Sequence, residues 1–356
     1  MSEFNDPFVI VRQMVQQGAE DGTYPSAAVA VGVGGQTLVR EAYGAARPET
    51  LFDMASMSKV LATTMIAFQM IEAGKLCLTD SVGSFFQAPP DKSDITVFQL
   101  MTHTSGIPAH FHLADLTDDP SRAADVILAQ PLAACPGQMT VYSCMGYILL
   151  GKILEQIGGR PLDQLAESLV FGPLGMKRTT YHPKAGDDIA PTERNRETGQ
   201  YLRGIVHDEN ARFLNGISAN AGVFSTLDDI ALFARMLASG GRLPNGTPYL
   251  STAMFALAAA NHTPGMTENR GLGFKLAGGE GNFMGDLFPA RSIGHTGFTG
   301  TSLVVDPGSG LYVVLLTNRV HPTRDNIGII RFRKLLHNAV YAAFSRSLAQ
   351  SAWRYD

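Results

Sequence analysis

The order of apolar and polar residues predicts strands near both ends of the chain and helices between them. An amphipathic pattern over residues 6–21 predicts a first helix. Two apolar runs, Ala27–Val33 and Thr37–Ala42, are separated by Gly34-Gly35, which indicates a β-hairpin. A second hairpin is predicted from Thr301–Asp306 and Leu311–Thr317, which flank a Pro-Gly-Ser-Gly turn.

The segment from Ser56 to Ala73 is predicted to be a buried helix. Between Lys59 and Glu72 it carries no charge, and apolar residues occupy every face. A lysine at the start of such a helix is unusual, because a desolvated ammonium is costly unless it is paired or deprotonated. We therefore single out Lys59 as a candidate for chemistry.

Three more helices complete the pattern, over Met145–Ile157, Leu227–Ser239 and about Ile327 to Ser347. Strands at both ends with helices between them predict an α/β plus all-α fold, in which an antiparallel sheet flanked by helices carries an inserted helical domain. We place the sheet domain at residues 1–77 and 241–356 and the inserted helical domain at residues 78–240.

Composition narrows the class of protein. The chain has 356 residues, of which 45% are hydrophobic and 17% charged, so a disordered protein is excluded. With 28 Lys and Arg against 32 Asp and Glu, and no basic run, it has no signature of nucleic-acid binding. No apolar run approaches the roughly 20 residues of a membrane span. Three cysteines and an N-terminus without a secretory pattern lead us to expect a cytoplasmic protein, and the oligomeric state stays open.

The first candidate motif is Ser56-Met57-Ser58-Lys59. Residues three apart share a helix face, so the Ser56 hydroxyl and the Lys59 amine can meet. A serine needs a base to become a nucleophile, and a desolvated lysine with a lowered pKa can serve as one. The free N–H groups at a helix N-terminus can stabilise an oxyanion. The alternative is an N-cap serine followed by a lysine that reaches solvent.

Two further motifs are weak when taken alone. Tyr142-Ser143-Cys144 precedes a predicted helix, and a phenol near an amine can relay protons. His295-Thr296-Gly297 reads as an edge strand whose small residues let a substrate approach, and the N–H of Phe298 is a candidate oxyanion donor. The competing interpretations are a tyrosine that caps the core and an ordinary glycine-bent strand.

Together and in this order, the three motifs are specific. The chain resembles the serine β-lactamase-like superfamily, nearest to the class C β-lactamases, the D-alanyl-D-alanine peptidases and the family VIII esterases. The resemblance spans about residues 24–345. It also includes the segments LFDMASMSK (51–59), LMTHTSGI (100–107), AGVFST (221–226) and LTNR (316–319).

The resemblance implies a role for each matching residue. Ser56 would be the acylated nucleophile and Lys59 its proton acceptor. Tyr142 would carry the proton to the leaving group and activate water, and His295 would stand in place of the lysine in the third motif. The oxyanion hole would be formed by the N–H groups of Ser56 and Phe298. The substrate-binding positions would be Cys144, Thr296 and Gly297, and the chemistry needs no cofactor.

Two departures from the family pattern limit this transfer. Cys144 stands where class C enzymes have an asparagine that bonds the substrate amide, and His295 replaces a lysine that is cationic at pH 7. Both changes favour small esters or amides over β-lactams, so we expect a serine hydrolase that acts through an acyl-enzyme. The alternatives are a penicillin-binding protein or D-amino-acid peptidase, a weak class C-type β-lactamase, and a penicillin-binding module without turnover.

Other residues support competing hypotheses. Cys144 with His295 could form a cysteine hydrolase pair. His110, His112 and Asp115 lie close enough in sequence to suggest zinc, although we expect no metal. His103 is interpreted as part of a structural turn. His207 fits either the border of a cleft or a solvated loop.

Overall fold

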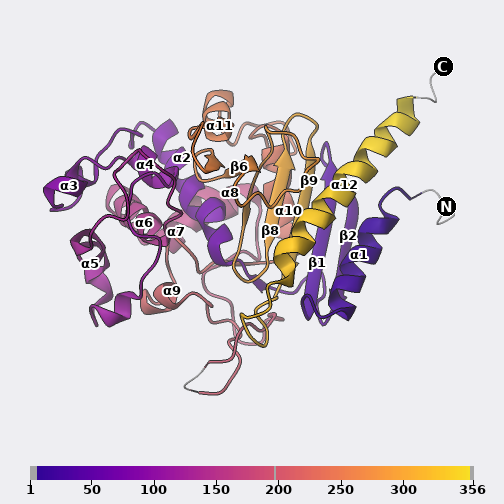
Figure 1. Ribbon diagram of the computed structural model, residues 1–356, viewed down its shortest axis with the longest axis horizontal. Helices are drawn as coiled ribbons and strands as arrows, with labels where there is room; N and C mark the ends of the chain where they lie inside the picture. The colour runs from indigo at the N-terminus through magenta and orange to yellow at the C-terminus, as the bar shows by residue number, and fades with distance from the viewer. Residues whose placement is uncertain (1–5, 196–197, 353–356) are drawn as a thin grey trace.

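A seven-stranded antiparallel sheet forms the centre of the molecule (Figure 1). The computed structural model describes residues 6–195 and 198–352, with side chains as far as residue 348. The strand order is β2-β1-β9-β8-β7-β6-β5, so the two ends of the sequence meet where β1 pairs with β9. The strands are β1 (Ser26–Val33), β2 (Gln36–Gly44), β5 (Glu268–Arg270), β6 (Lys275–Gly279), β7 (Ile293–Thr296), β8 (Ser302–Asp306) and β9 (Leu311–Thr317).

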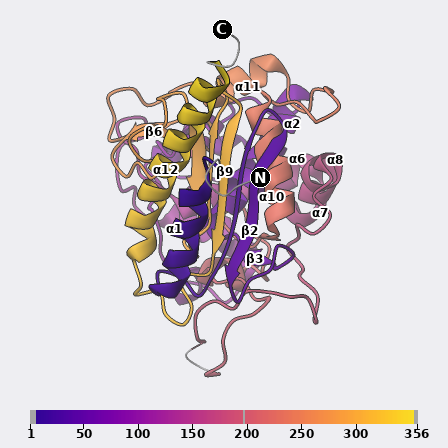
Figure 2. The same cartoon turned by 90° about the vertical axis from the view of Figure 1, so that its right-hand side faces the viewer.

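Helices cover both faces of the sheet. Along β1, Val29 and Val31 pack toward α1 (Val9–Glu20) and α12 (Gly328–Ala352), whereas Ala28 and Ala30 face the larger core that contains α10 (Leu227–Ala238). This alternation follows from the two-residue period of a strand. Figure 2 shows α1 and α12 side by side in front of the sheet and α10 behind it.

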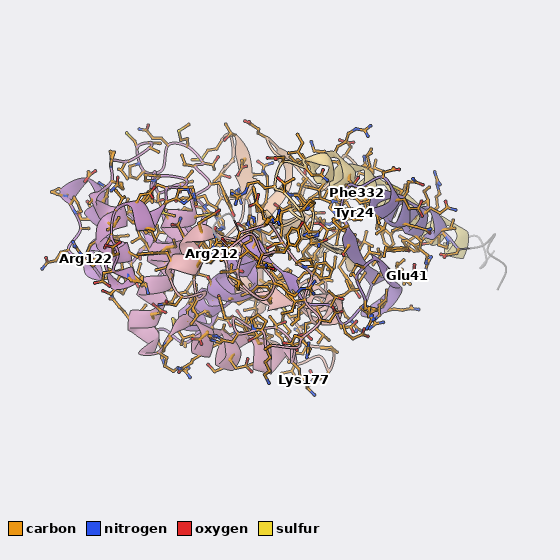
Figure 3. All side chains as sticks on the ribbon, turned by 90° about the horizontal axis from the view of Figure 1, so that it is seen from below. Tyr24, Glu41, Arg122, Lys177, Arg212 and Phe332 are labelled. Atoms are coloured by element: carbon orange, nitrogen blue, oxygen red, sulfur yellow. The ribbon has the colours of Figure 1, made fainter. Side chains whose placement is uncertain are left out.

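Aromatic packing joins the first and last helices. Tyr24, just after α1, donates a hydrogen bond from its hydroxyl to Val15 O at 3.0 Å, and its ring meets the ring of Phe332 edge-on at 5.3 Å. Figure 3 shows these two rings at the sheet end of the molecule, far from Arg122 in the helical part. The sheet layer is therefore closed by residues from both ends of the chain.

The remaining helices gather beside the sheet (Figure 1). The longest of them is α6 (Cys144–Gly158), which packs against α4 (Val97–Met101), α5 (Ala123–Ala129) and α7 (Leu162–Ala166). The other helical segments are α2 (Thr64–Glu72), η4 (Val82–Ser84), α3 (Pro90–Ser93), α4 (Val97–Met101), η5 (Leu113–Asp115), η6 (Pro120–Arg122), α5 (Ala123–Ala129), α7 (Leu162–Ala166), η7 (Glu167–Phe171), α8 (Gly172–Leu174), α9 (Glu209–Phe213) and α11 (Thr252–Ala259). A short ladder joins β3 (Phe52–Asp53) to β4 (Phe224–Ser225).

The predicted fold class, both hairpins and the terminal helices are confirmed. The division into domains at residues 78 and 240 stays a prediction. α10 lies in the range predicted for the inserted helical domain, but it packs on the sheet. None of the helices in the described ranges is long and apolar enough to cross a membrane.

The single helix expected from Ser56 to Ala73 is wrong. The segment consists of a 3₁₀ turn η2 (Ala55–Met57), a π-helical turn η3 (Lys59–Thr63) and then α2. Lys59 and Thr63 both donate side-chain hydrogen bonds to backbone carbonyls at residues 219–220, at 3.0 and 2.8 Å. Widened π-helical turns occur often at functional sites.

Candidate active site

The backbone turns sharply just before Ser56. Ala55 has φ of +46°, in the left-handed region that residues other than glycine rarely adopt. The buried carboxylate of Asp53 holds this turn, because one oxygen accepts a hydrogen bond from Ala55 N at 2.8 Å and the other accepts one from His207 N at 2.6 Å. Such strain persists only where the surroundings enforce it, and it collects at functional sites.

Lys59 lies one turn beyond Ser56 and is fully buried. Its Nζ is 3.1 Å from Ser56 Oγ, 3.0 Å from Asn220 O and 3.5 Å from Cys144 Sγ. The serine hydroxyl and the lysine amine are therefore in hydrogen-bonding contact, as the S-x-x-K spacing predicts.

The charge of Lys59 differs from the expectation. Burial alone lowers the pKa of Lys59, but its interactions with Cys144 and Tyr142 outweigh burial, and the net pKa is raised. The prediction of a lowered lysine pKa is therefore wrong. Periodicity showed that the helix is buried, but it could not show which groups face the amine.

Tyr142 lies directly before α6, whose N-cap is Ser143, and its ring faces two cations. Lys59 Nζ is 5.0 Å and the Arg270 guanidinium 5.2 Å from the ring centroid. The hydroxyl is buried, and no hydrogen-bond partner for it exists among the described residues. His103 packs against the ring at 4.5 Å and accepts a hydrogen bond from Ser143 N at 3.0 Å, which supports its expected structural role.

His295 reaches the same site from β7. Its ring centroid is 6.0 Å from that of Tyr142, and its Nδ1 donates to Thr296 O at 2.8 Å. Burial, Lys59 and Arg270 hold the pKa of His295 well below its usual value, so the imidazole is neutral at pH 7. Since Nδ1 carries the proton, Nε2 is an acceptor, and it has no partner within the described residues.

The loop after β7 is tied to the nucleophile turn. The hydroxyls of Thr299 and Thr301 donate to the carbonyls of Asp53 and Met54 at 2.7 and 3.2 Å. At Gly297 a Cβ atom would lie 2.1 Å from Thr301 Oγ1 and 2.4 Å from Met54 O, so only glycine permits this approach. In the described structure, the N–H groups of Ser56 and Phe298 make no hydrogen bond.

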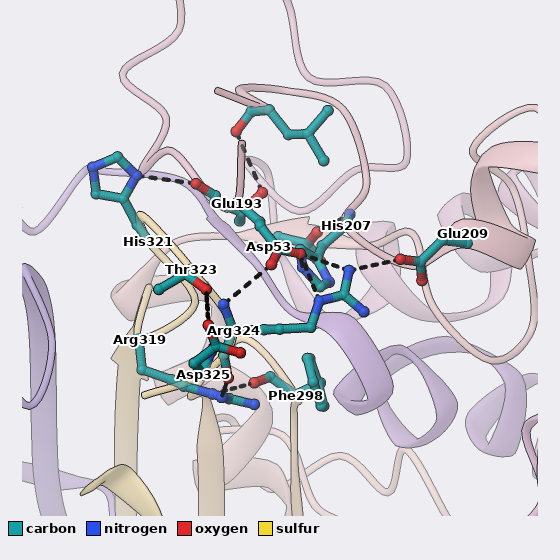
Figure 4. A network of polar contacts seen from close by, with 12 residues as sticks. Asp53, Glu193, His207, Glu209, Phe298, Arg319, His321, Thr323, Arg324 and Asp325 are labelled. Atoms are coloured by element: carbon teal, nitrogen blue, oxygen red, sulfur yellow. Dashed lines mark hydrogen bonds and ion pairs between the residues drawn. The ribbon is translucent and has the colours of Figure 1, made fainter. Parts of the chain in front are cut away.

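A polar network holds Phe298 from behind (Figure 4). Arg319 donates from Nε to Phe298 O at 2.8 Å, and its guanidinium lies 4.4 Å from the Phe298 ring. His207 is only 3% exposed and stacks on the same ring at 5.6 Å. Its Nε2 lies 3.1 Å from a Glu193 carboxylate oxygen, and Arg324 binds that carboxylate at 2.6 Å. His207 is therefore buried behind Phe298 and is not among the described residues that line the cavity, and the interpretation of a solvated loop is wrong.

A cavity of about 490 Å³ opens in front of Ser56. Its lining is rich in cations, with Glu268 as the acidic member among the described lining residues. Glu268 pairs with both Arg270 and Lys275. The lining residues are Ser56, Tyr142, Glu268, Arg270, Lys275, Gly281, Asn282, Phe283, His295, Thr296, Gly297, Phe298, Arg319, Ile329, Ile330, Arg333 and Lys334.

The structure places the remaining candidates as follows. Thr296 and Gly297 line the cavity, whereas the Cys144 thiol faces Lys59 behind Ser56. The rings of His110 and His112 lie 5.2 Å apart, and among the described residues no group of three or more His, Cys, Asp or Glu side chains could hold a metal ion.

Fold and site together define a class of protein, the serine hydrolases that act through an acyl-enzyme. The chain belongs to the beta-lactamase family, whose family model matches residues 11–338. It is 30% identical over 352 residues to a putative D-alanyl-D-alanine carboxypeptidase of Escherichia coli (strain K12), covering 85% of this chain and 80% of that protein.

Two more proteins illustrate the range of the family. An N-acetylmuramyl-L-alanine amidase of Bacillus subtilis (strain 168) is 29% identical over 362 residues, covering 87% of this chain and 80% of that protein. The solved structure of EstCE1, a hydrolase with promiscuous acyltransferase activity, superposes with a TM-score of 0.74 at 24% identity, covering 94% of this chain and 98% of that chain. Because the identity to EstCE1 is below 25%, that similarity supports the fold alone.

The sequence reasoning missed several residues that shape the site. Asp53 and Arg319 lie inside segments that carry the family resemblance, so those segments held a usable signal. Arg270 and Asn220 had no such signal, because a charged residue on an edge strand and a backbone carbonyl in a loop have no distinctive pattern. Only the fold brings them to Tyr142 and Lys59.

Proposed function

We propose that this protein hydrolyses small esters or amides through an acyl-enzyme formed on Ser56. The observation that carries the proposal is the contact between Ser56 Oγ and Lys59 Nζ at the base of a cavity that Tyr142 and His295 also line. A serine hydroxyl becomes a useful nucleophile when a neighbouring base takes its proton.

In the proposed reaction, Ser56 Oγ attacks the substrate carbonyl carbon while its proton passes to Lys59. The N–H groups of Ser56 and Phe298 stabilise the oxyanion, and the Tyr142 hydroxyl delivers a proton to the leaving group. Tyr142 and Lys59 then take a proton from water as its oxygen attacks the acyl carbon, and this proton passes to Ser56 Oγ as the bond between Oγ and the acyl carbon breaks and the acid leaves. Because the ammonium form of Lys59 is favoured at rest, Lys59 must lose a proton before it can accept the one from Ser56.

We assign His295 a neutral role. Its unprotonated Nε2 can accept a hydrogen bond from Tyr142 or from substrate, but it cannot supply the positive charge of the lysine in the family motif. Thr296 and Gly297 are proposed to line the substrate path, since both border the cavity.

The cationic lining supports a second candidate, a peptidase for substrates that end in a carboxylate. Arg270, Lys275, Arg333 and Lys334 all line the cavity, so a substrate anion has partners other than His295. A related protein is named a putative D-alanyl-D-alanine carboxypeptidase. β-Lactam hydrolysis and acylation without turnover are further outcomes of the test below.

The test compares wild type with Ser56→Ala on p-nitrophenyl butyrate, a peptide ending in D-Ala-D-Ala, and nitrocefin. We expect ester hydrolysis in wild type and its loss in Ser56→Ala, with an acyl adduct detectable by mass spectrometry on Ser56 alone. Release of D-alanine would favour the peptidase, and a lasting penicillin adduct would favour the binding module. Undiminished turnover by Ser56→Ala would reject the proposal.

We also propose a cytoplasmic location. The three cysteines, Cys77, Cys135 and Cys144, are free thiols, which is typical of a reducing compartment.

A further inference from the structure

Lys59 directs its amine at three acceptors. These are Ser56 Oγ, Asn220 O and Cys144 Sγ, at 3.1, 3.0 and 3.5 Å. An ammonium has three N–H donors and accepts no hydrogen bond, so this arrangement fits the protonated form. In the described part of the chain, the lysines paired with carboxylates are Lys92, Lys152 and Lys275, and Lys59 is not among them.

A fully buried cation needs a counter-charge nearby. Of the three acceptors, the thiol of Cys144 is the one that can become an anion near neutral pH, since neither a serine hydroxyl nor an amide carbonyl ionises there. Tyr142 presents its ring to Lys59 at 5.0 Å, and the Asp208 carboxylate also raises the pKa of Lys59 but is not among its ion-pair partners in the described chain, so the thiol at 3.5 Å is the closer group that can carry the charge.

The position of Cys144 in the fold also favours a thiolate. Cys144 is the first residue of α6, a helix of 15 residues, and lies at the end where the helix dipole stabilises negative charge. Cysteines at helix N-termini beside a lysine are the ones whose thiolate form is favoured.

We propose that Cys144 is the counter-ion of Lys59 and the store for its proton, a positioning role that rests on the proposed function of Ser56 and Lys59. In the resting enzyme the pair is an ammonium and a thiolate. When substrate displaces water, one proton moves from Lys59 Nζ to Cys144 Sγ, which leaves a neutral amine and a neutral thiol. Lys59 then accepts the Ser56 proton as Oγ bonds to the carbonyl carbon.

The charges of this cycle balance. The carbonyl π electrons move to the oxygen, so the oxyanion forms as Lys59 becomes an ammonium again. Lys59 passes that proton to the leaving group through Tyr142 as the carbon–leaving-group bond breaks. Cys144 returns its proton to Lys59 when product leaves and water re-enters. An asparagine, the class C residue at this position, could not store the proton.

The groups that face the thiol are Lys59 from η3, His110 from the loop before η5, and Asp208 at the start of α9. Burial raises the pKa of Cys144 and so does Asp208, but Lys59 and His110 outweigh them and the net pKa is lowered. The lowered pKa of Cys144 agrees with the contact between its thiol and the Lys59 amine at 3.5 Å.

The first test measures the thiolate directly and does not depend on activity. Cys77 and Cys135 are exposed, so Cys77→Ser with Cys135→Ser leaves Cys144 as the single thiol. We expect its ultraviolet thiolate absorbance to titrate at least one pH unit below the ordinary value of about 8.5. Adding Lys59→Met should move the titration back to or above that value. A Cys144 titration at or above about 8.5 in the presence of Lys59 would overturn the proposal.

The second test is kinetic and uses a conservative rescue. Cys144→Ser should lower kcat/KM for p-nitrophenyl butyrate by about 10²-fold, the usual size of a proton-transfer contribution, and should change its pH profile. Cys144→Asp restores an anion and should recover at least tenfold of that loss. An unchanged rate and pH profile in Cys144→Ser, or a folded Cys144→Asp no faster than Cys144→Ser, would overturn the proposal. Activity that survives Ser56→Ala would instead reject the proposed function, whatever the thiol titration shows.

Discussion

The substitution Gly297→Ala tests whether the loop after β7 builds the oxyanion hole. The added Cβ would lie 2.4 Å from Met54 O and 2.1 Å from Thr301 Oγ1. Threonine can rotate its hydroxyl away, but the carbonyl of Met54 belongs to the nucleophile turn. An ordinary carbon–oxygen contact is about 3.3 Å, so the two segments must separate by roughly 0.9 Å.

A separation of this size is large on the scale of catalysis. A misplacement of about 1 Å costs roughly 10²-fold in rate, and loss of one oxyanion donor costs about 10²–10³-fold. We therefore expect kcat/KM for p-nitrophenyl butyrate to fall by about 10²-fold, which corresponds to about 2.7 kcal/mol in transition-state stabilisation. Most of the loss should appear in kcat, because the donors act on the charge that develops during the reaction.

The assay compares steady-state hydrolysis of wild type, Gly297→Ala and Gly146→Ala, each below its own midpoint of thermal unfolding. Gly146 lies on α6, where an added Cβ would find its nearest neighbour at 3.4 Å, so Gly146→Ala controls for the change of residue type. A folded Gly297→Ala enzyme with kcat/KM within threefold of wild type would refute the assignment of this loop.

Three further predictions concern stability and supporting residues. His337 donates from Nδ1 to Phe283 O at 2.8 Å, and burial lowers its pKa to about 4. The unfolded chain binds this proton near pH 6.5, so stability is lost as pH falls below 6.5. Urea unfolding should show His337→Gln losing about 2 kcal/mol less than wild type between pH 7 and pH 5, and equal losses would contradict a neutral buried imidazole. Tyr142→Phe should lower kcat/KM by about 10²–10⁴-fold. The thermal midpoint should be equal to or higher than that of wild type, because the lost hydroxyl is buried and has no hydrogen-bond partner among the described residues, and full activity would exclude the proton relay. Arg319→Met removes the hydrogen bond to Phe298 O, and we expect kcat to fall about tenfold with KM nearly constant; a change in KM alone would place Arg319 in substrate binding instead.

Much of the fold follows from local patterns. The hairpin around Gly34-Gly35 and the strand pair β8–β9 are visible in the sequence because apolar runs end at turn residues. The buried helix was recognised from its lack of charge, but its π-helical start was not. That turn depends on hydrogen bonds from Lys59 and Thr63 to a segment about 160 residues away, which no local pattern records.

The site likewise has features that short motifs predict and features that depend on residues distant in the sequence. Three short motifs located Ser56, Tyr142 and His295, and the structure brings them to one cavity. Their charge states could not be predicted, because the lowered pKa of His295 follows from its burial and from Lys59 and Arg270, which only the fold brings to it. The raised pKa of Lys59 depends likewise on side chains that only the tertiary structure brings together.

The threonine hydroxyls that join the loop after β7 to the nucleophile turn make one mechanical unit of Ser56 and Phe298. Arg333 of α12 also lines the cavity and joins this unit, because it donates hydrogen bonds to Gly297 O and Thr301 O at 3.0 and 2.9 Å. Asn282, Ile330 and Lys334 line the same cavity and make no hydrogen bond to this unit in the described chain, so selectivity can drift through these three positions, in nature or in directed evolution, while the reaction centre is inherited intact.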